Sequence, residues 1–286
     1  MAEAQAPQSQ QDMAGPSSGL RFADTLCAID GSEGGFVAVE QAAAFAGSAG
    51  HLTLLLVTSF DIEGAHRAPA IGSTKATGIL NRATQICHEA GVPSTVEVDP
   101  AAPPSRVILD WSANRDLLAL GAPTTSRLRG MFTVGVADTA LGSFTIPLLA
   151  ARSVPGGHHV GHRIVLATDG REGSDELVEL GRRFAQARGA EMILLHAAGH
   201  ESHARRERVE QQGRRLQLAA GPNEVRVEHG SAHDVICATA DEVGASLVVM
   251  GSRRVNGLRA IGSVGRRVVH EAPCSVLLVP PERLYC

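Results

Sequence analysis

The chain has 286 residues, of which 44% are hydrophobic and 20% charged, as in ordinary globular proteins. Its formal net charge of −4 argues against a nucleic-acid partner or an anionic membrane surface. The 26 basic residues include a single lysine, Lys75, which is preceded by threonine, so a phosphate loop built on Gly-Lys-Ser/Thr is excluded. The five cysteines are not closely spaced, which argues against a disulfide framework or a zinc site and favours a reducing, cytoplasmic setting.

The chain begins with a polar stretch and then alternates apolar runs with amphipathic segments. Residues 1–20 have no apolar block, which predicts a disordered tail rather than a signal peptide. A first domain is expected over residues 21–152, where an apolar run ends at Asp30-Gly31. Further strands are predicted at Leu52–Thr58, Thr95–Asp99, Leu117–Gly121 and Pro147–Ala151, and helices at Phe36–Ala46, Thr74–Ala90 and Pro104–Ala113.

The same order recurs after a Gly- and His-rich linker at residues 153–162. Asp169-Gly170 follows Asp30-Gly31 at an offset of 139 residues. A second domain is expected over residues 163–281, followed by a short tail at 282–286. Its predicted strands are Arg163–Thr168, Met192–Ala198, Glu224–Glu228, Leu247–Gly251 and Ser275–Val279, and its predicted helices are Glu176–Arg188, Ser202–Ala219 and Ala232–Val243.

Alternating strands and helices predict parallel strands joined by right-handed crossovers. The strands are nearly continuous Leu, Val and Ile, as expected when helices cover both faces of a sheet. The fold class is therefore α/β, with two tandem, doubly wound, Rossmann-like domains. Ligands of such sheets bind beyond the carboxyl ends of the strands, which points to Asp30 and Gly121 in one half and to Asp169 and Gly251 in the other.

The most informative stretch runs from Val249 to Val269. It reads as a strand, a glycine-containing loop and a helix that opens at Gly262-Ser263. Free amide groups and the partial positive charge at a helix start suit a phosphate, although Ser263 alone is also an ordinary helix cap. Arg253, Arg254 and Arg259 are candidates to complete an anion site, or to be solvated surface side chains.

These motifs resemble those of a tandem universal stress protein. The resemblance is carried by Asp169-Gly170-Arg171-Glu172-Gly173-Ser174, by Gly262–Val264 and by Ala272–Val279. It covers about residues 21–281 and is stronger in the second half. It implies an adenine nucleotide alpha hydrolase-like fold in which the fifth strands of the two domains pair across a pseudo-twofold axis.

The resemblance also implies ATP or another adenine nucleotide as ligand, with Mg²⁺ as a companion. The residues that match in the second crevice, with their neighbours, are Thr168, Asp169, Ala197, Met250, Gly251, Arg253, Arg254, Gly262, Ser263 and Val264. Arg254 stands where ATP-binding members have a second glycine, and the loop from there to Gly262 is two residues shorter. The first half keeps Asp30, Val57, Gly121 and Gly135 but has Thr124 in place of the second glycine, so its site is expected to be altered.

Three functions remain open at this point. The first is a cytoplasmic stress-response regulator that binds an adenine nucleotide, works as a homodimer and is not an enzyme. The second is a scaffold of the same fold that binds no nucleotide and acts through dimerisation or partner binding, which the shortened loop and the altered first half favour. The third, a slow ATP hydrolase, lacks a general base, a phosphate-loop lysine and a metal cluster. His158, His159 and His162 are interpreted as linker residues rather than metal ligands, and no membrane partner is expected.

Overall fold

A computed structural model describes residues 22–58, 73–101, 103–122, 144–154, 156, 158–171, 173–198, 203–217, 223–252 and 263–280. The first half contains, in chain order, β1 (Asp24–Ile29), α1 (Glu33–Ala46), β2 (His51–Val57), α2 (Thr74–Glu89), β3 (Ser94–Asp99), α3 (Pro104–Ser112), β4 (Leu117–Gly121) and β5 (Leu148–Ala151). The second half contains β6 (Arg163–Thr168), α5 (Ser174–Arg188), β7 (Glu191–Ala198), α6 (His203–Gln217), β8 (Asn223–His229), α7 (Ala232–Glu242), β9 (Leu247–Gly251), α8 (Ser263–Glu271) and β10 (Ser275–Val279).

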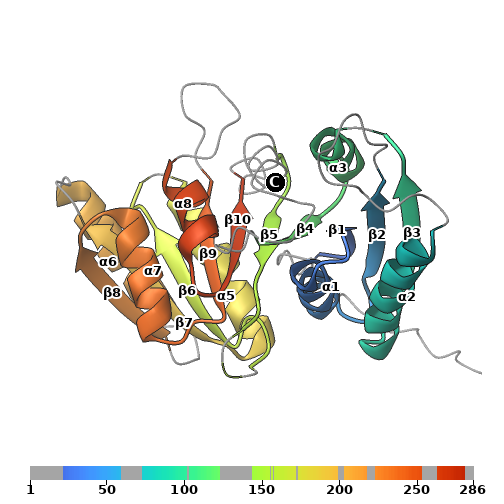
Figure 1. The fold of residues 1–286 in the computed structure, drawn as a ribbon. Helices are drawn as coiled ribbons and strands as arrows, with labels where there is room; N and C mark the ends of the chain where they lie inside the picture. Colours follow the sequence, from blue (N-terminus) through green and yellow to red (C-terminus); the bar gives the residue numbers. More distant parts are fainter. Residues whose placement is uncertain are drawn as a thin grey trace, which may run out of the picture.

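The described strands form one continuous sheet across both halves (Figure 1). The strand order is β3-β2-β1-β4-β5-β10-β9-β6-β7-β8. Neighbouring strands are parallel except for β5 and β10, which pair antiparallel through Leu149 and Leu277. The predicted α/β class and the pairing of the fifth strands are thereby confirmed, and each half has its switch in strand order between its first and fourth strands.

Two apolar layers lie on opposite faces of this sheet. On β1, Cys27 and Ile29 belong to one layer, whereas Leu26 and Ala28 belong to the other, as the two-residue period of a strand requires. Helices α1, α2 and α5 contribute to the first layer, and α3, α7 and α8 contribute to the second. The central strands are buried on both faces for this reason, which explains their continuous apolar composition.

Helix α1 begins three residues earlier than its apolar stripe predicts. Ser32 is its N-cap, and the Ser32 side chain accepts a hydrogen bond from the Gly35 amide at 3.1 Å. Such a cap satisfies one of the free amides of the first turn, so Glu33 and Gly34 become helical although neither lies on the apolar stripe.

The two halves meet through aromatic side chains as well as through β5 and β10. Phe45 of α1 and Phe184 of α5 are separated by the same 139 residues as the two Asp-Gly pairs. Their ring centroids lie 5.2 Å apart in an edge-to-face arrangement, and Phe22 contacts both rings. The Arg188 guanidinium lies over the rings of Phe45 and Phe184 and donates to the Ala44 carbonyl at 2.9 Å. Equivalent residues that contact each other are the signature of a twofold relation between the repeats.

None of the helices in the described part of the chain is long and apolar enough to cross a membrane.

Candidate functional site

The second crevice is built at the carboxyl ends of β6, β7 and β9. Ala167 pairs with Met250, and Thr168 pairs with His196, so the residues that follow these positions lie at the same edge of the sheet. Thr168 and Met250 are buried, whereas Asp169, Ala197 and Gly251 are only half-buried. The structure therefore brings five of the expected residues together, and it leaves three of them partly exposed at the edge where a ligand would bind.

A tight turn positions Asp169 after β6. The Arg171 amide donates to Asp169 Oδ1 at 3.0 Å, and the Ser174 hydroxyl donates to the Arg171 carbonyl at 2.7 Å. Gly170 has a φ of 65°, and a Cβ there would lie 2.9 Å from Val209 of α6. Both observations explain why glycine follows the aspartate: the backbone is left-handed and α6 packs directly on the turn.

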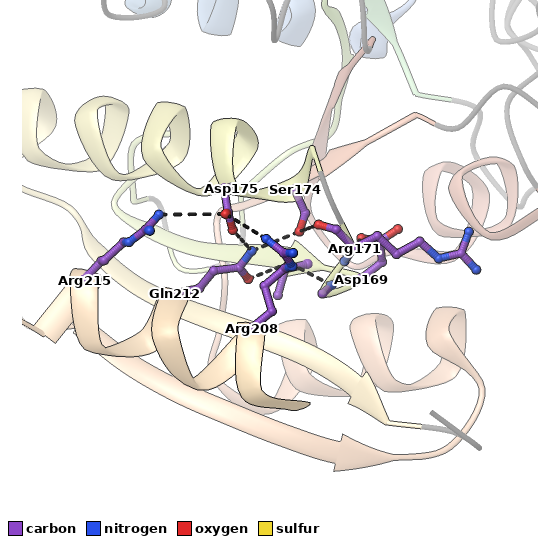
Figure 2. A network of polar contacts seen from close by, with 9 residues as sticks. Asp169, Arg171, Ser174, Asp175, Arg208, Gln212 and Arg215 are labelled. Atoms are coloured by element: carbon purple, nitrogen blue, oxygen red, sulfur yellow. Dashed lines mark hydrogen bonds and ion pairs between the residues drawn. The ribbon is translucent and has the colours of Figure 1, made fainter. Parts of the chain in front are cut away.

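A buried polar network joins this turn to α6 (Figure 2). Gln212 is 1% exposed, and its side-chain amide donates to Ser174 Oγ at 2.9 Å and to Asp175 Oδ1 at 2.6 Å. Its carbonyl oxygen accepts from the Thr168 hydroxyl at 2.9 Å. Gln212 thus ties the end of β6 and the first turn of α5 to α6, and it satisfies polar groups whose burial would otherwise be costly.

Two arginines of α6 neutralise the acidic start of α5 in the same network. Arg208 contacts Asp175 Oδ2 at 3.2 Å, and Arg215 lies 3.8 Å from the same oxygen (Figure 2). In the sequence, the arginines of α6 alternate with Glu207 and Glu210, which indicates a solvated face and reveals neither Gln212 nor this carboxylate on another helix. Helical spacing reveals partners on the same helix, but it carries no signal for contacts between helices.

The glycine loop lies largely outside the described residues. Arg253, Arg254, Arg259 and Gly262 fall there, so their predicted roles are proposals only. On one side of the loop, Gly251 pairs with Val279, and the Ser252 amide donates to the Val279 carbonyl at 2.9 Å. On the other side, α8 begins at Ser263, as predicted, and Val264 packs half-buried against the apolar layer of α7 and α8.

The first crevice differs in its closest contacts. Asp30 is 7% exposed, and its Oδ1 accepts from both the amide and the hydroxyl of Ser32, at 2.9 and 2.6 Å. A Cβ on Gly121 would lie 2.7 Å from the carbonyl carbon of Gly34, because the end of β4 packs directly on the first turn of α1. Among the described residues, a Cβ on Gly251 would meet Leu177 Cδ2 alone, at 3.5 Å. In that part of the chain, backbone packs beside Gly121 and does not pack beside Gly251.

Val57 and Gly135 are the other residues expected at the first-half site. Val57, at the end of β2, is 3% exposed and belongs to the apolar layer of α3. Gly135 falls outside the described residues.

Histidines of the linker and of the second half contact neighbouring protein groups. His196 is buried, and its Nδ1 lies 3.0 Å from the Thr168 carbonyl oxygen. His158 and His162 stack with ring centroids 4.8 Å apart in the linker. His233 and Asp234 belong to the first turn of α7, as predicted. No three His, Cys, Asp or Glu side chains of the described ranges form a group that could hold a metal ion.

The fold defines a tandem pair of doubly wound α/β domains joined through their fifth strands. The model of the universal stress protein family matches residues 22–152 and again residues 161–280. The chain therefore belongs to the universal stress protein family.

Individual relatives agree with this assignment. A protein described as the universal stress protein in QAH/OAS sulfhydrylase 3′region, from Thermus aquaticus, is 33% identical over 135 residues, which cover 41% of this chain and 96% of the relative. The crystal structure of a universal stress protein from Archaeoglobus fulgidus DSM 4304 has a TM-score of 0.72 at 20% identity and covers 91% of this chain and 99% of its own. A putative universal stress protein from Pseudomonas aeruginosa UCBPP-PA14 has a TM-score of 0.64 at 16% identity, with 93% and 95% covered. At these identities the two structures support the fold alone.

Proposed function

We propose that this universal stress protein is a cytoplasmic stress-response regulator that binds one adenine nucleotide per chain, in the crevice of its second half. The observation that carries the proposal is the contrast between the two fourth strands. Among the described residues, no backbone packs against Gly251 at the end of β9, and α8 begins twelve residues later in the chain, whereas Gly121 ends β4 against the backbone of α1. The first half then serves as the permanent partner of the second.

Backbone groups would hold the phosphates. Gly251 would let the chain approach an anion closely, and the free amides at the start of α8 would supply backbone donors. Lys75 lies on α2 of the first half, so no lysine is available in the second, and any side-chain charge must come from arginine. Arg253, Arg254 and the Ser263 hydroxyl are the proposed side-chain donors.

The residues at the ends of β6 and β7 would hold the nucleoside. We assign the Ala197 backbone to adenine, and Thr168, Met250 and Val264 to the walls of the site. Asp169 is the partly exposed carboxylate at this edge and would contact ribose or Mg²⁺. Mg²⁺, when bound with ATP, neutralises phosphate charge.

The contacts of Asp175, a carboxylate beside the crevice, favour binding over catalysis. Asp175 is neutralised by Arg208 and Arg215 and accepts a hydrogen bond from Gln212, so it is poorly placed to act as a general base. We therefore propose a regulator whose nucleotide occupancy is sensed by partners, rather than an ATP hydrolase.

Calorimetry on the full chain tests the proposal with AMP, ADP, ATP and cyclic AMP. We expect one nucleotide per chain and an affinity about 10- to 100-fold weaker in Asp169→Ala, since a hydrogen bond to a charged group contributes about 1.5–3 kcal/mol. Asp110→Ala is the matched control, because Asp110 lies on α3 with a side chain 73% exposed. Absence of binding at millimolar nucleotide would contradict the proposal and favour a partner scaffold, and two sites per chain would contradict the assignment to the second half.

A further inference from the structure

The C-terminal end of α8 is held by the other half of the chain. Arg152 follows β5 of the first half, and its guanidinium donates to the carbonyl oxygens of Val269 at 2.7 Å and His270 at 3.3 Å. These carbonyls belong to the last turn of α8, where helical carbonyls have no partner within the helix. The Val268 carbonyl in the same turn accepts from the Ala272 amide at 2.8 Å. Arg152 thus completes the C-terminal cap of a helix that belongs to the second half.

Arg152 is itself fixed by a buried network at the junction of the halves. Its backbone amide donates to the Ser275 hydroxyl oxygen at 3.0 Å, and its carbonyl accepts from the Gln41 side-chain amide at 2.7 Å. The Ser275 hydroxyl lies 2.7 Å from Gln41 Oε1, and Ser275 is fully buried. Helix α1, β5 and β10 therefore converge on the backbone of Arg152, which fixes the point from which its side chain reaches α8.

Because Arg152 is largely buried, its positive charge interacts favourably with the dipole of α8. Burial lowers the pKa of its guanidinium, and its Nε has no hydrogen-bond partner among the described residues. A cation at the negative end of a helix dipole stabilises the helix, and most strongly where water is excluded. Val268 and Val269 are buried beside it, so the charge lies against an apolar surface.

Arg152 of the first half caps a helix of the second half, but the equivalent residue of the second half is not an arginine. When β5 is matched with β10, the residue equivalent to Arg152 is Pro280. Proline carries neither a backbone N–H nor a side-chain donor, so the second half offers the first no corresponding contact. The first half thus contributes a cation to the second half. Among the described residues, backbone packs against Gly121 of the first half but not against Gly251 of the second.

We propose that Arg152 is a positioning residue for the second crevice: it fixes α8 from its C-terminal end, so that the amides at Ser263 are aligned for a phosphate. This inference rests on the proposed function for its ligand, but the hold on α8 does not depend on any ligand. It gives the first half a defined task, which is to preorganise the anion-binding helix of the second.

The test compares Arg152→Met, which keeps an apolar stem, with Arg152→Lys, which restores a cation. Titrations with AMP and with adenosine measure binding, and hydrogen exchange without ligand measures protection of residues 263–271. In Arg152→Met we expect faster exchange in α8, AMP affinity about fivefold weaker and adenosine affinity unchanged, because only the phosphate depends on the alignment of α8. Arg152→Lys should recover most of the AMP affinity.

Arg106→Met is the control, since Arg106 has a side chain 81% exposed on α3 and pairs with Asp110. Equal losses for AMP and adenosine in Arg152→Met would overturn the positioning role, as would unchanged exchange in α8. If Arg152→Met does not fold, Arg152→Gln, which keeps a neutral N–H donor, is judged by the same two criteria. A wild-type chain that binds neither ligand would refute the proposed function, while the exchange comparison would still decide whether Arg152 holds α8.

Discussion

Gly121 and Gly251 occupy equivalent strand ends, but among the described residues only Gly121 has a neighbour that leaves no room for a Cβ. A Cβ on Gly121 would lie 2.7 Å from backbone atoms of Gly34, which cannot move without displacing the first turn of α1. We expect Gly121→Ala to lower the free energy of unfolding by about 1–3 kcal/mol, the usual cost of overpacking. The matched change Gly251→Ala should alter it by less than about 1 kcal/mol, because 3.5 Å to Leu177 is an ordinary contact. Urea unfolding measures both, and equal losses would contradict the asymmetry of the two crevices.

Sequence reasoning located the residues of the second crevice that lie on strands. Asp169 follows a predictable strand, Ala197 and Gly251 lie at the ends of two others, and parallel strands place such ends at one edge of the sheet. It missed Gln212, because that contact depends on how α6 is placed across the β6–α5 turn. It also placed no residue at the end of α8, since the partner Arg152 is more than a hundred residues away in the sequence.

At the scale of elements, α5 carries a charge cluster that should make stability depend on acid pH. Glu179 accepts two hydrogen bonds from Arg182, at 2.7 and 2.8 Å, and one from Arg183 at 2.7 Å. The Arg182 side chain, helped by Arg183, lowers the pKa of Glu179 to about 2. A carboxylate with a lowered folded-state pKa stabilises the fold above its unfolded-state pKa, and this stability is lost as the pH falls toward 2.

We therefore expect Glu179→Gln to be less stable than the parent at pH 6 and nearly equal to it near pH 2. Because the Glu179 side chain is 42% exposed, solvent screening keeps the difference below about 1 kcal/mol. Chemical denaturation at several pH values measures it. Glu176→Gln on the same helix is the control, and a difference between Glu179→Gln and parent that is independent of pH would contradict the assignment.

The order of helices and strands was predictable because each strand is a continuous apolar run and each helix an amphipathic one. The first residue of a helix was harder to predict. In α1, for example, the N-cap lies outside the apolar stripe that reveals the helix. The pairing of β5 with β10 came from the family resemblance alone. Neither strand carries a charge or a turn signal that distinguishes an internal edge from an outer one.

For the whole molecule, the antiparallel pairing of β5 and β10 covers an edge that each half alone would expose. Unlike β5 and β10, the two outer edge strands carry charged side chains. β3 carries Glu97 and Asp99, and β8 carries Glu224, Arg226 and Glu228. Charged side chains on an edge strand oppose further pairing. A homodimer of the full chain, which the resemblance favours, is therefore proposed to use a surface other than the sheet edges.

Separating the halves should convert this internal contact into an association between molecules. Fragments 22–152 and 153–280 would each expose an apolar strand, Leu148–Ala151 or Ser275–Val279, together with Phe45 or Phe184. We expect each fragment to self-associate at micromolar concentration and the mixture to form a one-to-one complex, because backbone pairing and apolar burial both favour covering that edge.

Size-exclusion chromatography with light scattering measures the masses, with the intact chain as reference. The substitution Leu149→Lys in fragment 22–152 changes the residue that pairs with Leu277, and it should abolish the mixed complex. Fragments that stay monomeric alone and when mixed would contradict the view that this strand pair joins the two halves.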